Sequence, residues 1–255
     1  MQDLLIYLSC GLSAGIVGGY LGLGGGIVMV PFMTLLMGLD IKTAVPVSMT
    51  AIVVNSISAS NEYLKKNMVN IELALMLAVF TVLGNITGSY LSDVIPGDFI
   101  KLLFSAVLLY TAVSFIRKKK NAGTLAPESS RGTYFFVTVF VTFFTGLISA
   151  LIGIGGGIII IPVLFLVLNL PLTIVRGTWS FTFGFAAAAS TAVYFINDRI
   201  DFHLVPPIIV GIIIGGKIGG FLGTKAKPFA VKLAFFVLLL YTAFKLAYEP
   251  LRRLL

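Results

Sequence analysis

The sequence has few charged residues for its length. Of its 255 residues only 11% are Asp, Glu, Lys or Arg, whereas 58% are hydrophobic and the mean hydropathy is +1.05. A soluble domain carries about 25% charged residues, so this chain cannot cover a water-exposed surface with the charges it has. The composition therefore excludes an ordinary soluble protein and indicates a membrane protein.

Cysteine and histidine are almost absent. The single cysteine, Cys10, excludes an intramolecular disulfide and a cysteine metal cluster. The single histidine, His203, lies near the end of an apolar segment and is interpreted as a loop residue. Metal catalysis and a Ser-His-Asp triad therefore lack their usual parts. The sequence predicts a protein that is not an enzyme and that needs no metal or other cofactor.

Carboxylates are absent from the interiors of the apolar segments. Glu62 and Glu72 both lie near segment ends. A carrier of sodium or of a metal cation usually needs a buried carboxylate. The lack of one favours an anion as the solute of any binding site within the membrane.

The net charge of +8 could suggest a nucleic acid as partner, but the cations are not spread over a face. They cluster in short stretches between apolar segments, such as "RKKKN" from Arg117 to Asn121, and near the C-terminus at Arg252 and Arg253. Membrane proteins show this distribution because cytoplasmic loops are rich in Lys and Arg. The expected partner is the lipid bilayer and not a nucleic acid.

Apolar runs of about 20 residues recur along the chain, and each is long enough to cross a bilayer as a helix. They are apolar on all sides, unlike the alternating strands of membrane barrels. The predicted helical segments are Leu4–Tyr20, Ile27–Met37, Ala44–Leu64, Ile71–Leu91, Phe99–Ile116, Tyr134–Leu151, Ile158–Leu168, Ile174–Ile196, Leu204–Leu222 and Phe229–Tyr248. The fold class is an all-α polytopic membrane protein.

The chain also repeats itself at an offset of 131 residues. Pro31 then matches Pro162, and "LLYTA" from Leu108 matches "LLYTA" from Leu239. We interpret the chain as two tandem repeats of about five helical segments each, residues 1–117 and 133–255, joined by a polar linker at 118–132.

Two glycine triplets match in the same way, Gly24, Gly25, Gly26 and Gly155, Gly156, Gly157. Each precedes a segment of only about a dozen residues, which spans about half of the hydrocarbon layer. We therefore predict that the triplets break helices within the membrane. Backbone freed in this way must be buried in protein or line a wet cavity, and paired breaks of this kind point to a transporter's binding site. All six glycines are predicted to bind substrate.

A nucleotide-binding loop is the alternative for "GLGGGI". The third fingerprint position is Ile27, the motif follows an apolar helix, and no GK[ST] is present, so this alternative is rejected. The clusters at Gly84–Gly88 and Gly215–Gly220 are interpreted instead as sites of close helix packing.

The orientation of the two halves stays open. Lys65 and Lys66 are expected on the cytoplasmic side, with Asp93 outside. In the second half, Lys225 and the Arg252 pair cannot both be inside. The halves are parallel if each glycine-broken pair counts as one crossing, and inverted if it counts as two.

Several polar residues lie where hydrophobicity disfavours them. Lys217, within "GGKIGG", is predicted either to bind an anion or to extend its ammonium to the interface. Arg176 is predicted as an interfacial anchor or as an inward-facing cation. Four further residues, on the helices that follow the short segments, are predicted either to line a polar site or to join helices: Ser48, Asn55, Thr178 and Trp179.

The motifs "GLGGGIVMVP", "GIGGGIIIIP", "RGTWSF" and "GKIGGFLG" resemble the TauE/SafE sulfite exporter family, also called the 4-toluene sulfonate uptake permeases. The resemblance covers nearly the whole chain. The family's "GTS" is present only in part, as "GTW" at Gly177–Trp179 and as "PVS" at Pro46–Ser48. The resemblance implies a multi-pass protein of the bacterial inner membrane that carries sulfite, organosulfonates or related anions without hydrolysing ATP.

The predicted function is therefore secondary transport of a small sulfur-containing anion by alternating access between the two repeats. The anion is expected near the triplets, with Lys217 or Arg176 as its counter-charge. The alternatives are an anion channel and a transporter of another small organic anion. The exact anion, the direction of transport, the coupling ion and any homo-oligomer stay open.

Overall fold

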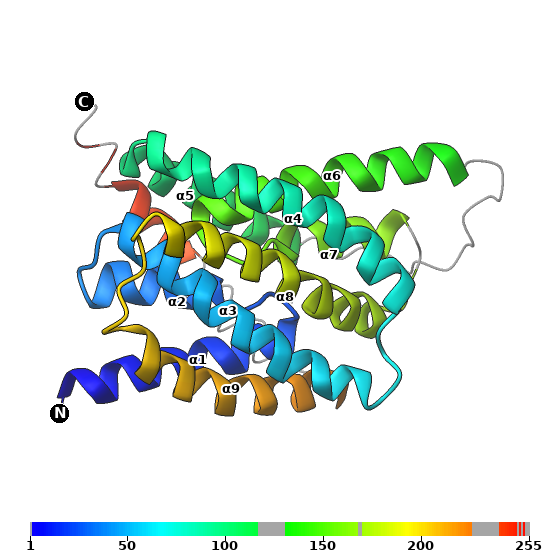
Figure 1. Ribbon diagram of the computed structural model, residues 1–255, viewed down its shortest axis with the longest axis horizontal. Coiled ribbons are helices and arrows are strands. Elements are labelled where there is room, and N and C mark those ends of the chain that lie inside the picture. Colours follow the sequence, from blue (N-terminus) through cyan, green and yellow to red (C-terminus); the bar gives the residue numbers. More distant parts are fainter. Residues whose placement is uncertain are drawn as a thin grey trace.

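The computed structural model describes residues 2–116, 131–167, 170–225, 240–248, 250 and 252. All regular elements in these ranges are helices (Figure 1). They are α1 (Gln2–Leu21), α2 (Gly26–Pro31), the π-helix η1 (Phe32–Leu36), α3 (Ile41–Leu64), α4 (Ile71–Val94), α5 (Gly97–Ile116), α6 (Arg131–Ile152), α7 (Gly157–Val167), α8 (Leu172–Ile196) and α9 (Val205–Lys225). Residues 240–248 are helical as well.

The predicted all-α fold is confirmed, and most helices begin and end within a few residues of the predicted positions. The short segment after the first triplet forms α2 and η1, which follow each other without a gap. α6 begins at Arg131, a turn earlier than predicted. Residues 117–130, most of the predicted linker, and residues 229–239, the start of the last predicted segment, lie outside the described residues.

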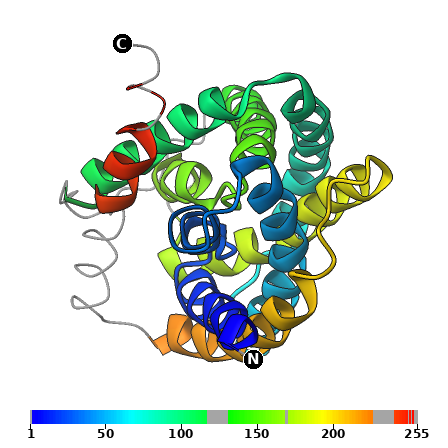
Figure 2. The ribbon, with the colours of Figure 1, turned by 90° about the vertical axis from the view of Figure 1, so that its left-hand side faces the viewer.

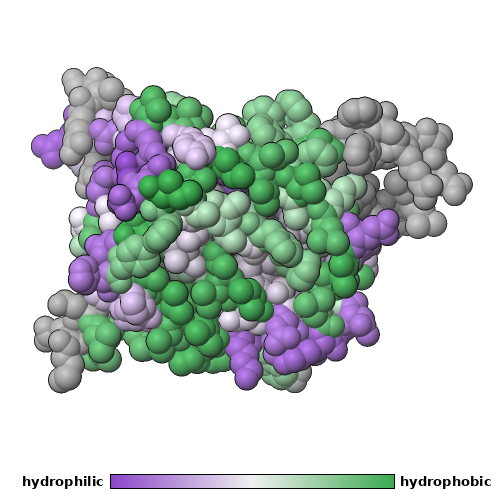
Figure 3. Space-filling view, viewed as in Figure 1, coloured by the Kyte–Doolittle hydropathy of each residue, from purple (hydrophilic) through white to green (hydrophobic). Residues whose placement is uncertain are grey.

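The outer surface is that of a membrane protein. In the described part, five helices are long and apolar enough to cross a bilayer: α1, α3, α4, α8 and α9. Figure 3 shows a hydrophobic band across the middle of the molecule, with hydrophilic residues gathered toward its two sides. Large apolar side chains such as Ile57, Leu83 and Phe140 are exposed on the outside of the molecule. A surface of this kind is stable against lipid and not against water.

The two polar ends are named here by one residue each. The Lys65 end contains the C-terminal ends of α1, α3 and α9, because Tyr63 hydrogen-bonds to the Tyr20 carbonyl and Lys66 to Thr224. The Asp93 end contains the start of α3 and the ends of α4 and α8, because Lys42 and Arg199 both contact Asp93. The end of α9, with Lys225, therefore lies at the same end of the molecule as Lys66. This is the arrangement expected if Lys225, and not the Arg252 pair, lies on the cytoplasmic side.

The long helices form two sets that run in opposite directions. One set contains α1, α3 and α9, which run parallel to one another. The other set contains α4, α6 and α8, which are also parallel to one another. The start of α8 packs on the end of α3, since a Cβ on Gly177 would lie 3.0 Å from the Cβ of Tyr63. The corresponding helices α3 and α8 are thus antiparallel, which is the arrangement expected of the inverted alternative.

Contacts in the two halves correspond at the offset of 131 residues. The Tyr63 hydroxyl donates to the Gly19 carbonyl at 3.3 Å, and the Tyr194 hydroxyl donates to the Ala150 carbonyl at 2.8 Å. Asn67 and Asp198, which follow α3 and α8, both have φ of 53°. In the same way α1 packs on α9 and α6 packs on α4.

Glycines allow these two helix pairs to approach closely. A Cβ on Gly84 would overlap the Phe143 carbonyl of α6, and a Cβ on Gly215 would overlap the Leu12 carbonyl of α1. In lipid, helices associate by packing of small residues and not by the hydrophobic effect. The packing role predicted for the two glycine clusters is confirmed.

The short helices lie inside the bundle. Every residue of α2 is buried, and in Figure 2, viewed from the side of the N-terminus, α2 and α7 lie within a ring of longer helices. Broken backbone at this position has protein around it, as the membrane interior requires.

Candidate functional site

Two glycine turns, residues 22–26 and 153–157, reverse the chain inside the bundle. After α1 ends, the backbone folds back so that a Cβ on Gly25 would lie 2.6 Å from the Ala14 carbonyl oxygen. Gly25, the N-cap of α2, has φ of 92°, and Gly156, just before α7, has φ of 60°. L side chains rarely adopt this left-handed region, so glycine is required for the reversal.

The glycine turns meet at the centre of the molecule. A Cβ on Gly24 would lie 3.6 Å from the Cα of Gly155, and a Cβ on Gly26 would overlap the Gly153 carbonyl oxygen. The structure thus brings the six predicted glycines together, and all of them are buried. In this conformation the two backbones themselves fill the place where the turns meet.

Ser48 and Trp179, which correspond at the offset of 131, both hold the second glycine turn. The Ser48 hydroxyl donates to the Gly153 carbonyl at 2.8 Å, and the Trp179 indole N–H donates to the Gly155 carbonyl at 3.1 Å. Both side chains are fully buried. Their donors therefore position the turn in the conformation described.

Asn55 lies beside the first glycine turn with its amide unused. Its side chain is 1% exposed, and neither Oδ1 nor Nδ2 has a hydrogen-bond partner among the described residues. A Cβ on Gly18 would lie 2.6 Å from Nδ2, and a Cβ on Gly25 would lie 3.3 Å from it. An unpaired buried polar group costs about 1–3 kcal/mol, so this amide is expected to have a partner outside the chain.

A groove of about 690 Å³ opens between α3, α8 and α9, close to Asn55. Its polar lining is Ser56, Ser58, Ser60, Asn61, Lys65 and Lys217. Its apolar lining includes Phe181 and Phe185, whose rings meet edge to face at 5.4 Å. The groove residues of α3 run from the middle of the helix to its end, so the groove extends from the membrane interior to the Lys65 end.

Lys217 is the predicted site residue that lines this groove. It lies eight residues before the end of α9 at Lys225, which is about 12 Å of helix. Within the described ranges its ammonium has no ion-pair or hydrogen-bond partner, whereas Lys65 pairs with Glu62 at 2.9 Å. Its neighbour Gly216 contacts Asn55, so the groove and the first glycine turn are one residue layer apart.

Arg176 lies against the first glycine turn, where a Cβ on Gly22 would lie 3.0 Å from the Cβ of Arg176, and Thr178 lies beside the start of α4. The Arg176 guanidinium lies 5.8 Å from the centroid of the Tyr20 ring, at the Lys65 end. The Thr178 hydroxyl accepts a hydrogen bond of 3.0 Å from the backbone N–H of Asn70, the N-cap of α4. The structure therefore brings four predicted residues to the glycine turns (Ser48, Asn55, Arg176 and Trp179) and Lys217 to the groove, whereas Thr178 lies at neither place.

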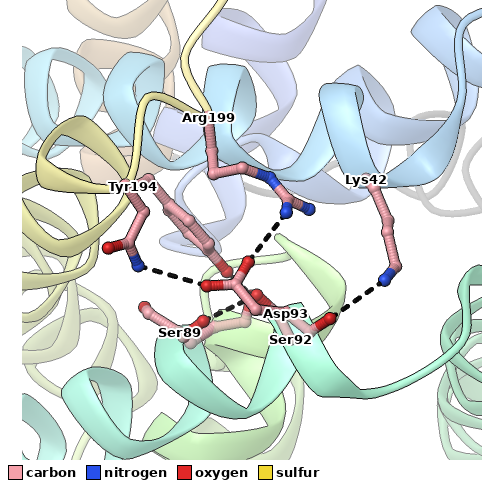
Figure 4. A network of polar contacts seen from close by, with 8 residues as sticks. Lys42, Ser89, Ser92, Asp93, Tyr194 and Arg199 are labelled. Carbon is pink, nitrogen blue, oxygen red and sulfur yellow. Dashed lines mark hydrogen bonds and ion pairs between the residues drawn. The ribbon is translucent and has the colours of Figure 1, made fainter.

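The Asp93 end is held by a polar network that sequence reasoning did not find (Figure 4). Arg199 forms an ion pair with Asp93 at 2.9 Å, and the Asn197 amide donates to the same carboxylate at 3.1 Å. Lys42 donates to the Asp93 carbonyl at 3.4 Å. These contacts join the start of α3 to the ends of α4 and α8.

Most polar residues of the groove lining correspond to apolar residues in the other half, although Ser60 corresponds to Thr191. Ser56 corresponds to Ala187, and Lys217 corresponds to Ile86. Asn85 is the counterpart of Gly216, and its side chain accepts a hydrogen bond of 2.8 Å from Ser190. Gly216 itself has no side chain that could pair with Asn55 in this way. Among the described residues, the polar groove is thus a feature of the Lys65 end.

Comparison with known proteins identifies the family. The sequence model described as "Sulfite exporter TauE/SafE" matches residues 7–246. The chain belongs to the TauE/SafE sulfite exporter family. This TauE/SafE protein is therefore a multi-pass membrane transporter, and the family supports anions as its solutes.

Similar proteins carry names that agree. The Bacillus subtilis "Probable membrane transporter protein YunE" is 24% identical, over 97% of this chain and 98% of that protein. A Xylella fastidiosa "Probable membrane transporter protein" is 26% identical, over 88% and 87%. The Arabidopsis thaliana "Sulfite exporter TauE/SafE family protein 5" is 31% identical, over 43% of this chain and 25% of that protein. No solved structure matches the chain.

Proposed function

We propose that this protein is a secondary transporter of sulfur-containing anions, of the sulfite or organosulfonate class, in the bacterial inner membrane. The observation that carries the proposal is the unpaired Lys217 ammonium in a polar groove at membrane depth. A cation in this position costs several kcal/mol unless it has a partner. A bound anion would supply that partner.

The groove lining favours an anion over a cation. Its two charged residues are Lys65 and Lys217, and Lys65 is already paired with Glu62. The hydroxyls of Ser58 and Ser60 can donate to sulfonate or sulfite oxygens, which accept hydrogen bonds. None of the described residues that line the groove is a carboxylate, so a metal cation would lack its preferred ligands there.

The size of the groove supports an organosulfonate in particular. A volume of about 690 Å³ is far larger than a bare anion needs. Phe181 and Phe185 of α8 and Ile213 of α9 form an apolar wall that lines the same groove as the hydroxyls of α3. An apolar body against this wall, with its charged group toward Lys217, would use both sides of the groove.

We further propose alternating access between two inverted repeats, residues 1–117 and 133–255, joined by residues 118–132. The matched contacts of Tyr63 and Tyr194 and the antiparallel α3 and α8 support it. In such a carrier, the groove would be the open side at the Lys65 end, and the ionic network would close the Asp93 end. The transition would open the Asp93 end and close the groove.

Charge distribution supports the cytoplasm as the side to which the groove opens. The Lys65 end carries Lys65, Lys66, Arg176 and Lys225, whereas Lys42 and Arg199 at the Asp93 end both lie against Asp93. Cytoplasmic ends of membrane proteins carry the excess of Lys and Arg.

A thermal-shift screen of the purified protein tests the proposal. Sulfite, thiosulfate, sulfate, taurine and toluene sulfonate would be added separately, with chloride as the reference. A sulfur-containing anion at 100 times its Kd should stabilise the protein by about 2.7 kcal/mol through mass action. The proposal is wrong if the anions shift the Tm no more than chloride does.

A further inference from the structure

The groove between α3, α8 and α9 opens on the side of the molecule. Three large apolar residues of its lining, one from each helix, are exposed: Ile57 by 64%, Phe185 by 47% and Ile213 by 48%. Lys217, which also lines the groove, is exposed as well. A cavity enclosed by protein would bury these side chains, so the groove is accessible from the side along the part that they line.

The side on which the groove opens faces lipid. α9 is one of the described helices that are long and apolar enough to cross a bilayer. Ile213 and Phe221 lie one helical turn before and after Lys217 on the same face, and both are exposed, Phe221 by 43%. Lys217 therefore lies within an apolar stripe of α9 that the hydrocarbon layer would cover.

A lysine on such a stripe needs either an anion beside it or a route to the interface. Hydrocarbon strongly disfavours an ammonium, and Lys217 lies about 12 Å of helix before the end of α9 at Lys225. Lys65, which is nearer to that end of the molecule, is paired with Glu62 at 2.9 Å. No described residue pairs with Lys217 in the same way. An anion that binds Lys217 would have lipid beside it.

The lining suits an anion that carries an apolar chain. Ser58 lies against Gly216, the neighbour of Lys217, because a Cβ on Gly216 would lie 3.1 Å from the Cβ of Ser58. On α8, the rings of Phe181 and Phe185 meet edge to face at 5.4 Å and form an apolar wall. A charged group at Lys217 and a chain along this wall would match the two kinds of lining. Because the groove is open to lipid, it would not limit the length of that chain.

We infer that the groove is entered sideways from the lipid leaflet at the Lys65 end and binds single-chain amphiphilic anions. The charged group lies at Lys217, and the chain lies along Phe185 and Ile213 in contact with lipid. This inference rests on the proposed function, to which it adds the route of the substrate and its shape. An amphiphile concentrates in the leaflet before it binds, so each methylene group of its chain increases the apparent affinity.

The first part of the test is a series of linear alkanesulfonates with one head group and a growing chain. Ethane-, butane-, hexane- and octanesulfonate are titrated against the full chain in lipid nanodiscs, and binding to empty nanodiscs is subtracted. The Kd, referred to the free aqueous concentration, should fall about fourfold for each methylene group that leaves water. Lys217→Gln should raise the Kd of every member at least tenfold, because all members share the head group.

The second part measures whether lipid reaches the groove and whether the ligand displaces it. Phe185→Trp is compared with Phe140→Trp, a change on α6 at an aromatic residue that is 66% exposed and does not line the groove. The parent supplies the background of the buried Trp179. Lipids with brominated acyl chains should quench the fluorescence of both variants. Octanesulfonate should relieve the quenching of Phe185→Trp alone, whereas ethanesulfonate, which has almost no chain, should relieve neither.

Three results would each overturn the inference: a Kd that does not change with chain length, no bromine quenching of Phe185→Trp beyond the parent's, or quenching that octanesulfonate does not relieve. The last result would assign the groove to membrane lipid. If any of them occurs while ethanesulfonate binds the parent and Lys217→Gln weakens that binding, the lateral route falls and the proposed function stands. If neither sulfite nor any sulfonate binds the parent, both fall.

Discussion

Replacing Gly25 by alanine should destabilise the protein more than the same change at Gly38. Both glycines have positive φ, 92° and 68°, so alanine would be strained at either position by about 1–2 kcal/mol. A Cβ on Gly25 would lie 2.6 Å from the Ala14 carbonyl oxygen, whereas a Cβ on Gly38 would have nothing within 4 Å. Backbone cannot yield as a flexible side chain can, and overpacking adds about 1–3 kcal/mol.

The difference between the two variants is therefore the cost of the overlap alone. For a chain of this size about 1 kcal/mol corresponds to about 2–4 °C in Tm, so Gly25→Ala should melt several degrees below Gly38→Ala. Thermal unfolding of the detergent-solubilised proteins measures this directly. Transport by Gly25→Ala should also be lost, while Gly38→Ala keeps it. Equal Tm values for the two variants would refute the close packing of the first glycine turn.

Three further predictions concern single side chains. Lys217→Gln should leave the Tm without anion unchanged and weaken anion binding at least tenfold, whereas Lys245→Gln, outside the groove lining, should leave both the Tm and anion binding unchanged; titrations of both variants decide this. Ser48→Ala should lower stability by about 1–3 kcal/mol because the Gly153 carbonyl loses its buried donor, as thermal unfolding would show; a Tm equal to the parent's contradicts it. Asp93→Asn should increase labelling of cysteines placed at the Asp93 end, and unchanged labelling would count against a closing role for the ion pair with Arg199.

The fold was largely predictable because membrane-spanning helices leave a strong signal. Apolar runs without carboxylates predicted the helices, and the glycine triplets predicted where α1 and α6 end. The distribution of Lys and Arg could not decide whether the second half crosses the membrane parallel or antiparallel to the first half. Antiparallel packing of α3 on α8 depends on long-range contacts such as Gly177 with Tyr63, which local sequence does not encode.

The candidate site was predictable only in part. Glycine, asparagine and lysine at disfavoured positions pointed to the glycine turns, Asn55 and Lys217. Arg176 and Thr178 share a motif with Trp179, but successive residues of a helix point in different directions, so the motif did not keep them together. The pairing of Asp93 with Arg199 joins the end of α4 to the loop after α8, which is far away in sequence, and neither segment carries a signal of its partner.

The central claim is that the protein carries a sulfur-containing anion through the Lys217 groove. It is tested most directly by uptake of radiolabelled sulfite and toluene sulfonate into proteoliposomes, for the parent protein and for Lys217→Gln beside Lys245→Gln. The account predicts saturable uptake of at least one of these anions by the parent and by Lys245→Gln, and strongly reduced uptake by Lys217→Gln. Uptake no greater than that of protein-free liposomes, or uptake by Lys217→Gln equal to the parent's, would contradict it.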